Sequence, residues 1–293
     1  MSASDVPLAR DALSIFKLRI GVAIMMSAIA GAAITPGPLP APWRIAALAA
    51  AVLAASASAG AFNQWAEADL DRMMKRTAGR PFAAGRFRAG PSWLAAILAL
   101  LASAVAAAYW SANGWAAFYT FTGAFVYGVV YTVWLKRRSS LNIVVGGLAG
   151  SFAVLAGAAA VDPVVQAPPL LRAIVLFLWT PPHFWSLAIA SHDDYASANV
   201  PMLPVVAGDA YAAKVILAHT LALVGLSLLP VLWSAGPFYL SGATVGGAAF
   251  VWTSVRLTQE TSRRRAIQNF LASLLQLALL LGGAITDRLV GSF

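Results

Sequence analysis

Long uncharged apolar stretches alternate with short polar connections along the chain. Nine of these stretches are about as long as the 17–25 residues that a helix needs to cross a bilayer. They cover residues 20–36, 45–62, 93–110, 115–135, 141–161, 173–191, 215–233, 238–255 and 266–286. The pattern predicts an all-α membrane protein in which nine transmembrane helices form a bundle. It shows no separate soluble domain, so residues 1–293 are expected to form one domain.

Two polar connections are longer than the others. They cover residues 67–91 and 192–214. Each follows an even-numbered span, so both are expected on the same side of the membrane, where they would cap a central cavity in the bundle. Six of the eleven acidic residues lie in these two loops: Glu67, Asp69, Asp71, Asp193, Asp194 and Asp209.

The composition agrees with a membrane location. Hydrophobic residues make up 60% of the 293 and charged residues only 11%, whereas a soluble domain has about 25% charged residues. The chain has no cysteine, which excludes disulfides and thiolate chemistry.

The net charge of +9 is distributed unevenly across the predicted spans. If the spans alternate from a cytoplasmic N-terminus, all of the 20 Lys and Arg residues except Arg44, Arg172 and Arg288 fall on the cytoplasmic side. Membrane proteins keep Lys and Arg inside in this way. The asymmetry predicts a cytoplasmic N-terminus and an external C-terminus, and it explains the basic excess without nucleic acid.

The first long loop begins with a spaced set of oxygen-bearing side chains. Asn63, Glu67 and Asp71 are four residues apart, so on a helix each step advances by about 40° and all three share one face. Asp69 falls on the opposite side. Carboxylates at the membrane edge are costly unless they bind something. Oxygen ligands without cysteine or paired histidines suit Mg²⁺, and a solvated polar loop is the alternative.

Basic residues follow this acidic set at once. Lys75, Arg76 and Arg80 lie in the same loop, and arginine can bind phosphate oxygens with two parallel hydrogen bonds. Metal-binding acids beside phosphate-binding bases indicate a diphosphate site. Lys136 lies in a third polar cluster, "YTVWLKRRSSLNIVVGG", which can add to this charge or act only as a membrane-side anchor. Asn142, just inside the next span, is polar where lipid would make it costly.

The second loop is entered through "PPHFWSLAIASHDDY". His183 and Asp194 are eleven residues apart, about 20° out of register, so they share a face if the helix continues between them. A site role for His183 and a structural hydrogen bond are both open. The two prolines and glycine of "NVPMLPVVAGD" predict an irregular connection that covers the cavity.

Four blocks of the sequence resemble one family. "NQWAEADLDRMMKRTAGRP", "YTVWLKRRSSLNIVVGG", "TPPHFWSLAIASHDDY" and "VPMLPVV" are similar to the heme O synthase branch of the UbiA-type intramembrane prenyltransferases and occur in the same order. The resemblance implies a Mg²⁺-dependent transfer of the farnesyl group from farnesyl diphosphate to heme b, in a bacterial-type inner membrane. It implies partners among heme A synthase and terminal-oxidase assembly factors.

The resemblance also assigns residues to roles. Asn63, Glu67, Asp71 and Asp194 match its metal-binding and catalytic positions, and Lys75, Arg76, Arg80 and Lys136 are expected to bind the diphosphate. His183, Asn142 and Tyr195 are expected on the acceptor side. The family usually has two prolines and a tryptophan where this chain has Ala153, Val154 and Ala158, and an arginine where it has Ser191.

Other functions stay open at this point. The nearest is a prenyltransferase of the same fold that uses another acceptor, such as an aromatic ring or a quinone precursor. A secondary transporter would also have polar residues in its spans, although here the charges gather at one membrane face. A non-catalytic membrane protein that handles heme is the third alternative.

Overall fold

The computed structural model describes residues 8–233 and 235–291, and within these ranges the chain is helical, with no strand. The long helices are α2 (Leu18–Ile34), α3 (Pro42–Ala66), α5 (Pro91–Ser111), α6 (Gly114–Phe125), α8 (Leu148–Val161), α9 (Ala167–Ala190), α12 (Asp209–Leu228), α13 (Pro237–Gln259) and α14 (Arg263–Leu289). Shorter helices are α1 (Leu8–Ile15), α4 (Ala68–Met73), α7 (Asn142–Gly146), α10 (His192–Ser197) and α11 (Leu203–Ala207). A π-helical segment, η1 (Val126–Leu135), extends α6, and a 3₁₀ turn, η2 (Leu229–Trp233), extends α12.

Each predicted span lies within helical segments except for at most two residues at its ends, and the span 141–161 is divided between α7 and α8 at Gly147. In the part of the chain that the structure describes, seven segments are long and apolar enough to cross a membrane. The two others that were expected are α2, which is apolar but only 17 residues long, and α13, which does not reach the same apolarity. The all-helical membrane class is confirmed, and the number of nine spans stays a prediction.

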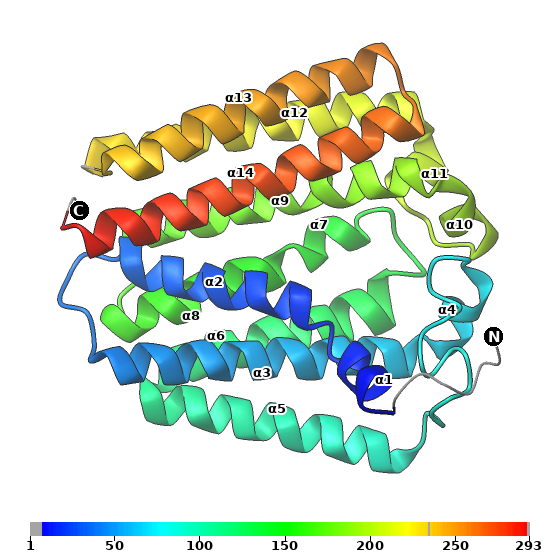
Figure 1. Cartoon of the computed structure of the whole chain (residues 1–293), viewed down its shortest axis with the longest axis horizontal. Coiled ribbons are helices and arrows are strands. Elements are labelled where there is room, and N and C mark those ends of the chain that lie inside the picture. Colours follow the sequence, from blue (N-terminus) through cyan, green and yellow to red (C-terminus); the bar gives the residue numbers. More distant parts are fainter. Residues whose placement is uncertain (1–7, 234, 292–293) are drawn as a thin grey trace.

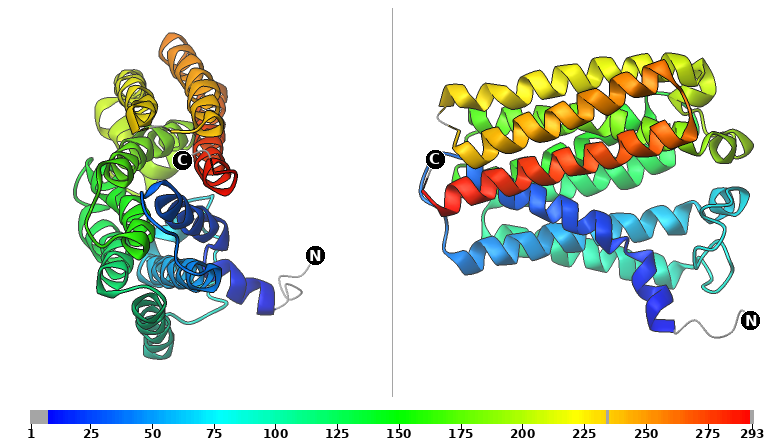
Figure 2. Two further views of the ribbon diagram at one scale, coloured as in Figure 1. Left: turned by 90° about the vertical axis from the view of Figure 1, so that its left-hand side faces the viewer. Right: turned by 45° about the horizontal axis from the view of Figure 1, so that its top comes forward.

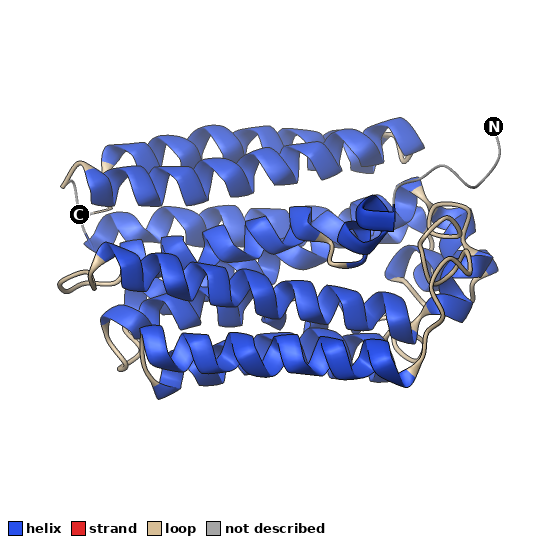
Figure 3. Ribbon diagram, turned by 60° about the horizontal axis from the view of Figure 1, so that its bottom comes forward, coloured by secondary structure: helices blue, strands red, loops and turns tan. Residues whose placement is uncertain are grey.

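The long helices run side by side as a bundle (Figure 1). The short helices α4, α10 and α11 gather at one end (Figure 1), and the loops around them lie at that end in the right-hand view of Figure 2 and in Figure 3. The turn between α2 and α3 and the end of α14 lie at the other end (Figure 1). The two long loops therefore meet at one end of the bundle, as the alternation of spans predicts.

Small residues let neighbouring helices approach closely. A Cβ atom on Gly31 of α2 would lie 2.1 Å from the carbonyl oxygen of Val154, and one on Gly157 of α8 would lie 1.7 Å from that of Ala28. Neither position tolerates a side chain, so α2 and α8 pack backbone against backbone, an arrangement common between membrane helices.

The first helix is fixed against α3 by polar contacts. Gln64 Nε2 donates to the carbonyl oxygens of Ser14 (2.9 Å) and Ile15 (3.1 Å). Asp11 accepts hydrogen bonds from Arg86 of the first long loop (2.5 and 3.0 Å). These contacts hold the junction of α1 and α2, and with it Lys17, over the end of α3.

Candidate active site at one end of the bundle

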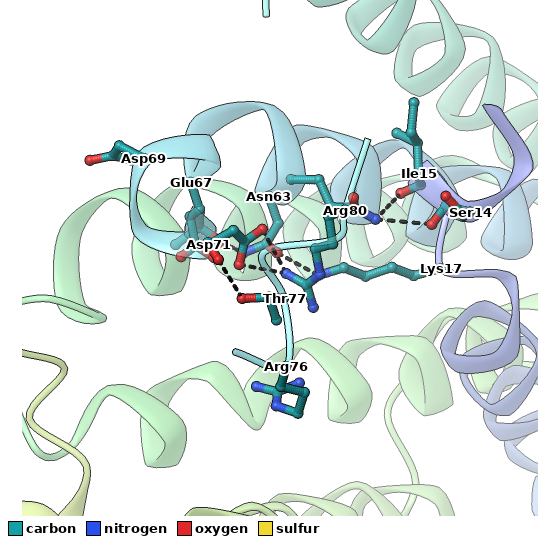
Figure 4. A network of polar contacts seen from close by, with 12 residues as sticks. Ser14, Ile15, Lys17, Asn63, Glu67, Asp69, Asp71, Arg76, Thr77 and Arg80 are labelled. Atoms are coloured by element: carbon teal, nitrogen blue, oxygen red, sulfur yellow. Dashed lines mark hydrogen bonds and ion pairs between the residues drawn. The ribbon is translucent and has the colours of Figure 1, made fainter. Parts of the chain in front are cut away.

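Asn63, Glu67 and Asp71 lie together where α3 meets α4 (Figure 4). The helix is interrupted at Glu67, yet the Glu67 N–H still donates to Asn63 O (3.0 Å) and the Asp71 N–H to Glu67 O (2.8 Å). The helical register therefore continues through the break, and the three side chains share a face, as their spacing predicts. All three are buried, with at most 2% of their surface exposed.

Asp69 points away from this group (Figure 4). It is exposed and binds Arg137 through two hydrogen bonds of 2.9 and 2.8 Å. The guanidinium of Arg137 holds the pKa of Asp69 below its ordinary value. Asp69 therefore belongs to the surface, although it lies in the same stretch of sequence.

Cations surround the buried carboxylates. Lys136 Nζ donates to Glu67 Oε2 (2.5 Å), and Arg80 donates to both carboxylate oxygens of Asp71 (2.9 Å each). A third cation, Lys17, donates to Asn63 Oδ1. Two carboxylates thus face three cations, while Glu67 Oε1 is buried with no hydrogen-bond partner among the described residues. With Lys17 protonated, this cluster has an excess of positive charge, which suits it to an anionic ligand.

The sequence does not mark Lys17 as a site residue, because it looks like a basic residue flanking the first span. Its ammonium also contacts the Tyr127 hydroxyl (3.2 Å). Lys17 has a left-handed backbone (φ 48°), and a Cβ on Gly60 would come within 3.3 Å of its side chain. Loss of contact with water, and then repulsion from Arg80 and Lys136, lower its pKa to about 7.

The π-helical segment η1 supplies another wall of the cluster. In an α-helix Tyr127 and Thr132 would diverge by about 140°. In η1 hydrogen bonds join residues five apart, as between Lys136 N and Tyr131 O (2.9 Å). This wider turn lets Tyr127 contact Lys17 and Thr132 contact Asn63 (3.0 Å).

The second long loop meets the first through Asp194 and Tyr195. Asp194 accepts from the backbone N–H groups of Lys75 (3.2 Å) and Arg76 (3.3 Å). The Tyr195 hydroxyl accepts from the Arg76 guanidinium (3.3 Å), and burial raises the pKa of this phenol. The structure therefore places Tyr195 beside Arg76, which is predicted to bind the diphosphate. Asp194 lies against the turn that contains Arg76.

The expectation that His183 and Asp194 share a helix face is wrong, because α9 ends at Ala190 and the chain turns before α10. His183 is buried instead between the rings of Trp179 and Phe270, with centroids 4.3 and 4.4 Å away. Its Nδ1 contacts Ser273 Oγ at 2.7 Å.

Asn142 is fully buried at the start of α7. Its Nδ2 donates to Ser139 O (2.7 Å), and its Oδ1 has no partner among the described residues. The acceptor-side roles of His183, Asn142 and Tyr195 stay predictions.

The donor set at this end fits a hard cation that needs few protein ligands. Within residues 8–233 and 235–291, no three His, Cys, Asp or Glu side chains converge closely enough to form a metal site. Mg²⁺ typically takes one or two carboxylates and completes its shell with water and phosphate. Glu67, Asp71 and the carboxamide of Asn63 supply such a set, and the unpartnered Glu67 Oε1 offers a free ligand.

An apolar pocket adjoins the cluster. Its wall on α3 includes Val52, Ser56, Ala59 and Gly60, which continue the face that carries Asn63. Lys17 and Tyr127 line its polar end. The free volume is about 80 Å³, well below the roughly 300 Å³ at the lower end of small-ligand sites. A long chain would enter only if the surrounding side chains moved apart.

The fold and this cluster define an integral membrane protein with a cation-rich site at one end of a helical bundle. The sequence matches the UbiA prenyltransferase family over residues 24–275, so the chain belongs to that family.

Two relatives from Paramagnetospirillum magneticum match almost the full length. The chain is 56% identical over 277 residues to protoheme IX farnesyltransferase 2, covering 94% of this chain and 96% of that protein. It is 45% identical over 282 residues to protoheme IX farnesyltransferase 1, covering 95% and 98%.

Solved structures share the fold at low identity. A digeranylgeranylglyceryl phosphate synthase has a TM-score of 0.77 at 15% identity, covering 96% of this chain and 99% of that one. A UbiA homolog from Archaeoglobus fulgidus, bound to DMAPP and Mg²⁺, has a TM-score of 0.69 at 14% identity, covering 92% and 98%.

Proposed function

We propose that this protein transfers the farnesyl group of farnesyl diphosphate to a vinyl group of heme b and adds water, which gives heme O. The observation that carries the donor half of this proposal is the buried face of Asn63, Glu67 and Asp71 with its surplus of cations beside an apolar pocket. The acceptor half rests on the farnesyltransferase relatives, which match over nearly their whole length.

The cations and the carboxylates of the cluster have different roles at the diphosphate. Lys17, Arg80 and Lys136 would bind its oxygens and stabilise the negative charge that grows as the bond to C1 breaks. Asn63, Glu67 and Asp71 would hold Mg²⁺, whose chemistry when bound is to neutralise that same charge. A UbiA homolog of the same fold was solved with DMAPP and Mg²⁺ bound, which supports Mg²⁺ as the metal of this proposal.

The remaining chemistry needs an apolar environment and few titratable groups. The C1–O bond breaks and diphosphate leaves; the terminal carbon of the vinyl group then bonds to C1. This leaves a carbocation on the carbon next to the porphyrin ring. Water adds to this carbon, loses a proton and becomes the hydroxyl of the product. The pocket next to Lys17 would take the farnesyl chain and keep water from C1, and the ring of Tyr127 would stabilise positive charge.

The membrane arrangement is part of the proposal. We propose nine spans, with α2 and α13 crossing the bilayer alongside the seven longer or more apolar segments. The two long loops would then lie in the cytoplasm, with the protein in a bacterial inner membrane. The proposal includes heme A synthase and terminal-oxidase assembly factors as partners that take up the product.

The length of the apolar pocket gives a test of the donor. Ser56 lies seven residues, or about 10 Å, before Asn63 on the same face of α3. Ser56→Phe would shorten the pocket, so we expect KM for farnesyl diphosphate to rise about tenfold while geranyl diphosphate, one isoprene unit shorter, is affected less. Steady-state kinetics with both donors measure this. An equal rise in KM for both donors would contradict the placement of the farnesyl group in this pocket.

The acceptor can be tested by comparing heme b with mesoheme, in which ethyl groups replace the vinyl groups. With farnesyl diphosphate and Mg²⁺, we expect heme b to stimulate diphosphate release and mesoheme not to. The same experiment with 4-hydroxybenzoate addresses the alternative of an aromatic acceptor. Stimulation by 4-hydroxybenzoate, or equally by both hemes, would contradict the proposed acceptor.

A further inference from the structure

A second cavity lies at the opposite end of the bundle from the carboxylate cluster. Its volume is about 290 Å³, and it is formed by the ends of α2, α9, α13 and α14 together with η2. Arg172 lines it and precedes Ala190, the last residue of α9, by five helical turns, roughly 27 Å at 1.5 Å per residue. This is close to the thickness of a bilayer core, so the cavity is separate from the donor site.

Arg172 is a buried charge that forms no ion pair with any of the residues that the structure describes. Only 3% of its surface is exposed, and neither terminal guanidinium nitrogen has a hydrogen-bond partner among the described residues. The phenol of Tyr239 is a polar neighbour of the guanidinium, with its ring centroid 5.8 Å from Cζ, but a neutral phenol does not balance the charge. The carboxylate of Asp287, at this end of α14, is occupied by the backbone N–H groups of Phe238 (3.1 Å) and Tyr239 (2.7 Å). Leaving a buried charge unpaired is strongly destabilising, so a ligand is expected to complete this site.

The walls of the cavity indicate the kind of ligand. Arg288 lines it as a second cation and donates to Gly37 O (2.5 Å). Most of the other lining residues are apolar, and they include Ile34, Pro230 and Trp233. A guanidinium has a planar fork of donors that matches phosphate. The site therefore combines phosphate-binding donors with an apolar surface, the two halves of a phospholipid.

We propose that this cavity binds the phosphate of an anionic phospholipid from the leaflet opposite the donor site, with Arg172 as its principal ligand. The position supports this source, because the end of a bundle about as long as the bilayer is thick lies at the level of the headgroups. Free phosphate could make the same hydrogen bonds, but it has no apolar part to pack against the apolar wall. The inference is independent of the proposed farnesyl transfer.

Thermal unfolding in detergent tests the proposal. We expect phosphatidylglycerol to raise the Tm of the purified protein by about 2–4 °C. Diacylglycerol, which lacks the phosphate, should have no such effect, and inorganic phosphate at the same concentration should have much less. Arg172→Met should abolish the shift while keeping the apolar stem of the side chain. Arg44→Met should keep it, because Arg44 is exposed at the same end of the bundle and does not line the cavity.

Two results would overturn the assignment. An unchanged phosphatidylglycerol shift in Arg172→Met would place the lipid elsewhere, and equal stabilisation by inorganic phosphate would make this a site for the free anion. If Arg172→Met does not fold, the variant Arg288→Met is used in its place. The lipids bound to it are then counted by native mass spectrometry. We then expect one fewer phosphatidylglycerol retained than in the wild type, and no difference would contradict the proposal.

Discussion

The double variant Glu67→Gln, Asp71→Asn is expected to lose about 10³-fold or more of kcat/KM for farnesyl diphosphate. The change keeps the shape of both side chains and removes both buried negative charges, which are the groups expected to hold Mg²⁺. Lys136 and Arg80 lose their ion-pair partners in the same variant. Diphosphate release with farnesyl diphosphate and heme b measures the effect.

Asp69→Asn is the matched control for that loss. Asp69 lies between the two targets in sequence, but it is exposed and pairs with Arg137 on the other side of α4. Surface ion pairs of this kind contribute little, so activity should stay within about twofold of the wild type. If the double variant still releases diphosphate at the wild-type rate, or if Asp69→Asn is equally damaging, the donor-site assignment is wrong.

Lys17→Met is expected to lower kcat/KM for farnesyl diphosphate on the order of 10²-fold, which is typical of removing one charge-stabilising donor. The reason is structural, because the ammonium contacts Asn63 and Tyr127 and lies between the carboxylate cluster and the apolar pocket. Binding of farnesyl diphosphate, followed by calorimetry, should weaken in the same variant.

Arg19→Met controls for the loss of a positive charge near the first span. Arg19 is exposed two residues from Lys17, so this variant should bind and turn over the donor like the wild type. A normal rate in Lys17→Met would show that Lys17 serves only to join α1 to α2. Equal losses of activity in both variants would mean that the positive charge near the first span acts on the membrane topology and not in the site.

The sequence predicts those features that depend on local periodicity. Uncharged stretches of membrane-spanning length coincide with the long helices, and the alternation of spans brings the two long loops to one end. The four-residue spacing of Asn63, Glu67 and Asp71 places them on one face even though the helix is interrupted at Glu67. The same spacing separates Asp69 from them.

Features that depend on packing or on irregular backbone could not be predicted in this way. Lys17 enters the site because Gln64 fixes α1 against α3, a contact between residues far apart in sequence. Thr132 reaches Asn63 only through the wider π-helical turn. The eleven-residue spacing of His183 and Asp194 predicts a shared face only for a continuous helix, and the turn at Ser191 separates them. No local pattern in the sequence indicates these backbone changes.

The most direct test of the proposed function is the mass of the heme after reaction in ¹⁸O-labelled water. Purified protein is incubated with Mg²⁺, farnesyl diphosphate and heme b, and the porphyrin is analysed by mass spectrometry. We expect a heme heavier by one farnesyl group and one hydroxyl, with the hydroxyl oxygen drawn from the labelled water. Release of diphosphate while the heme keeps its original mass would contradict farnesyl transfer to heme.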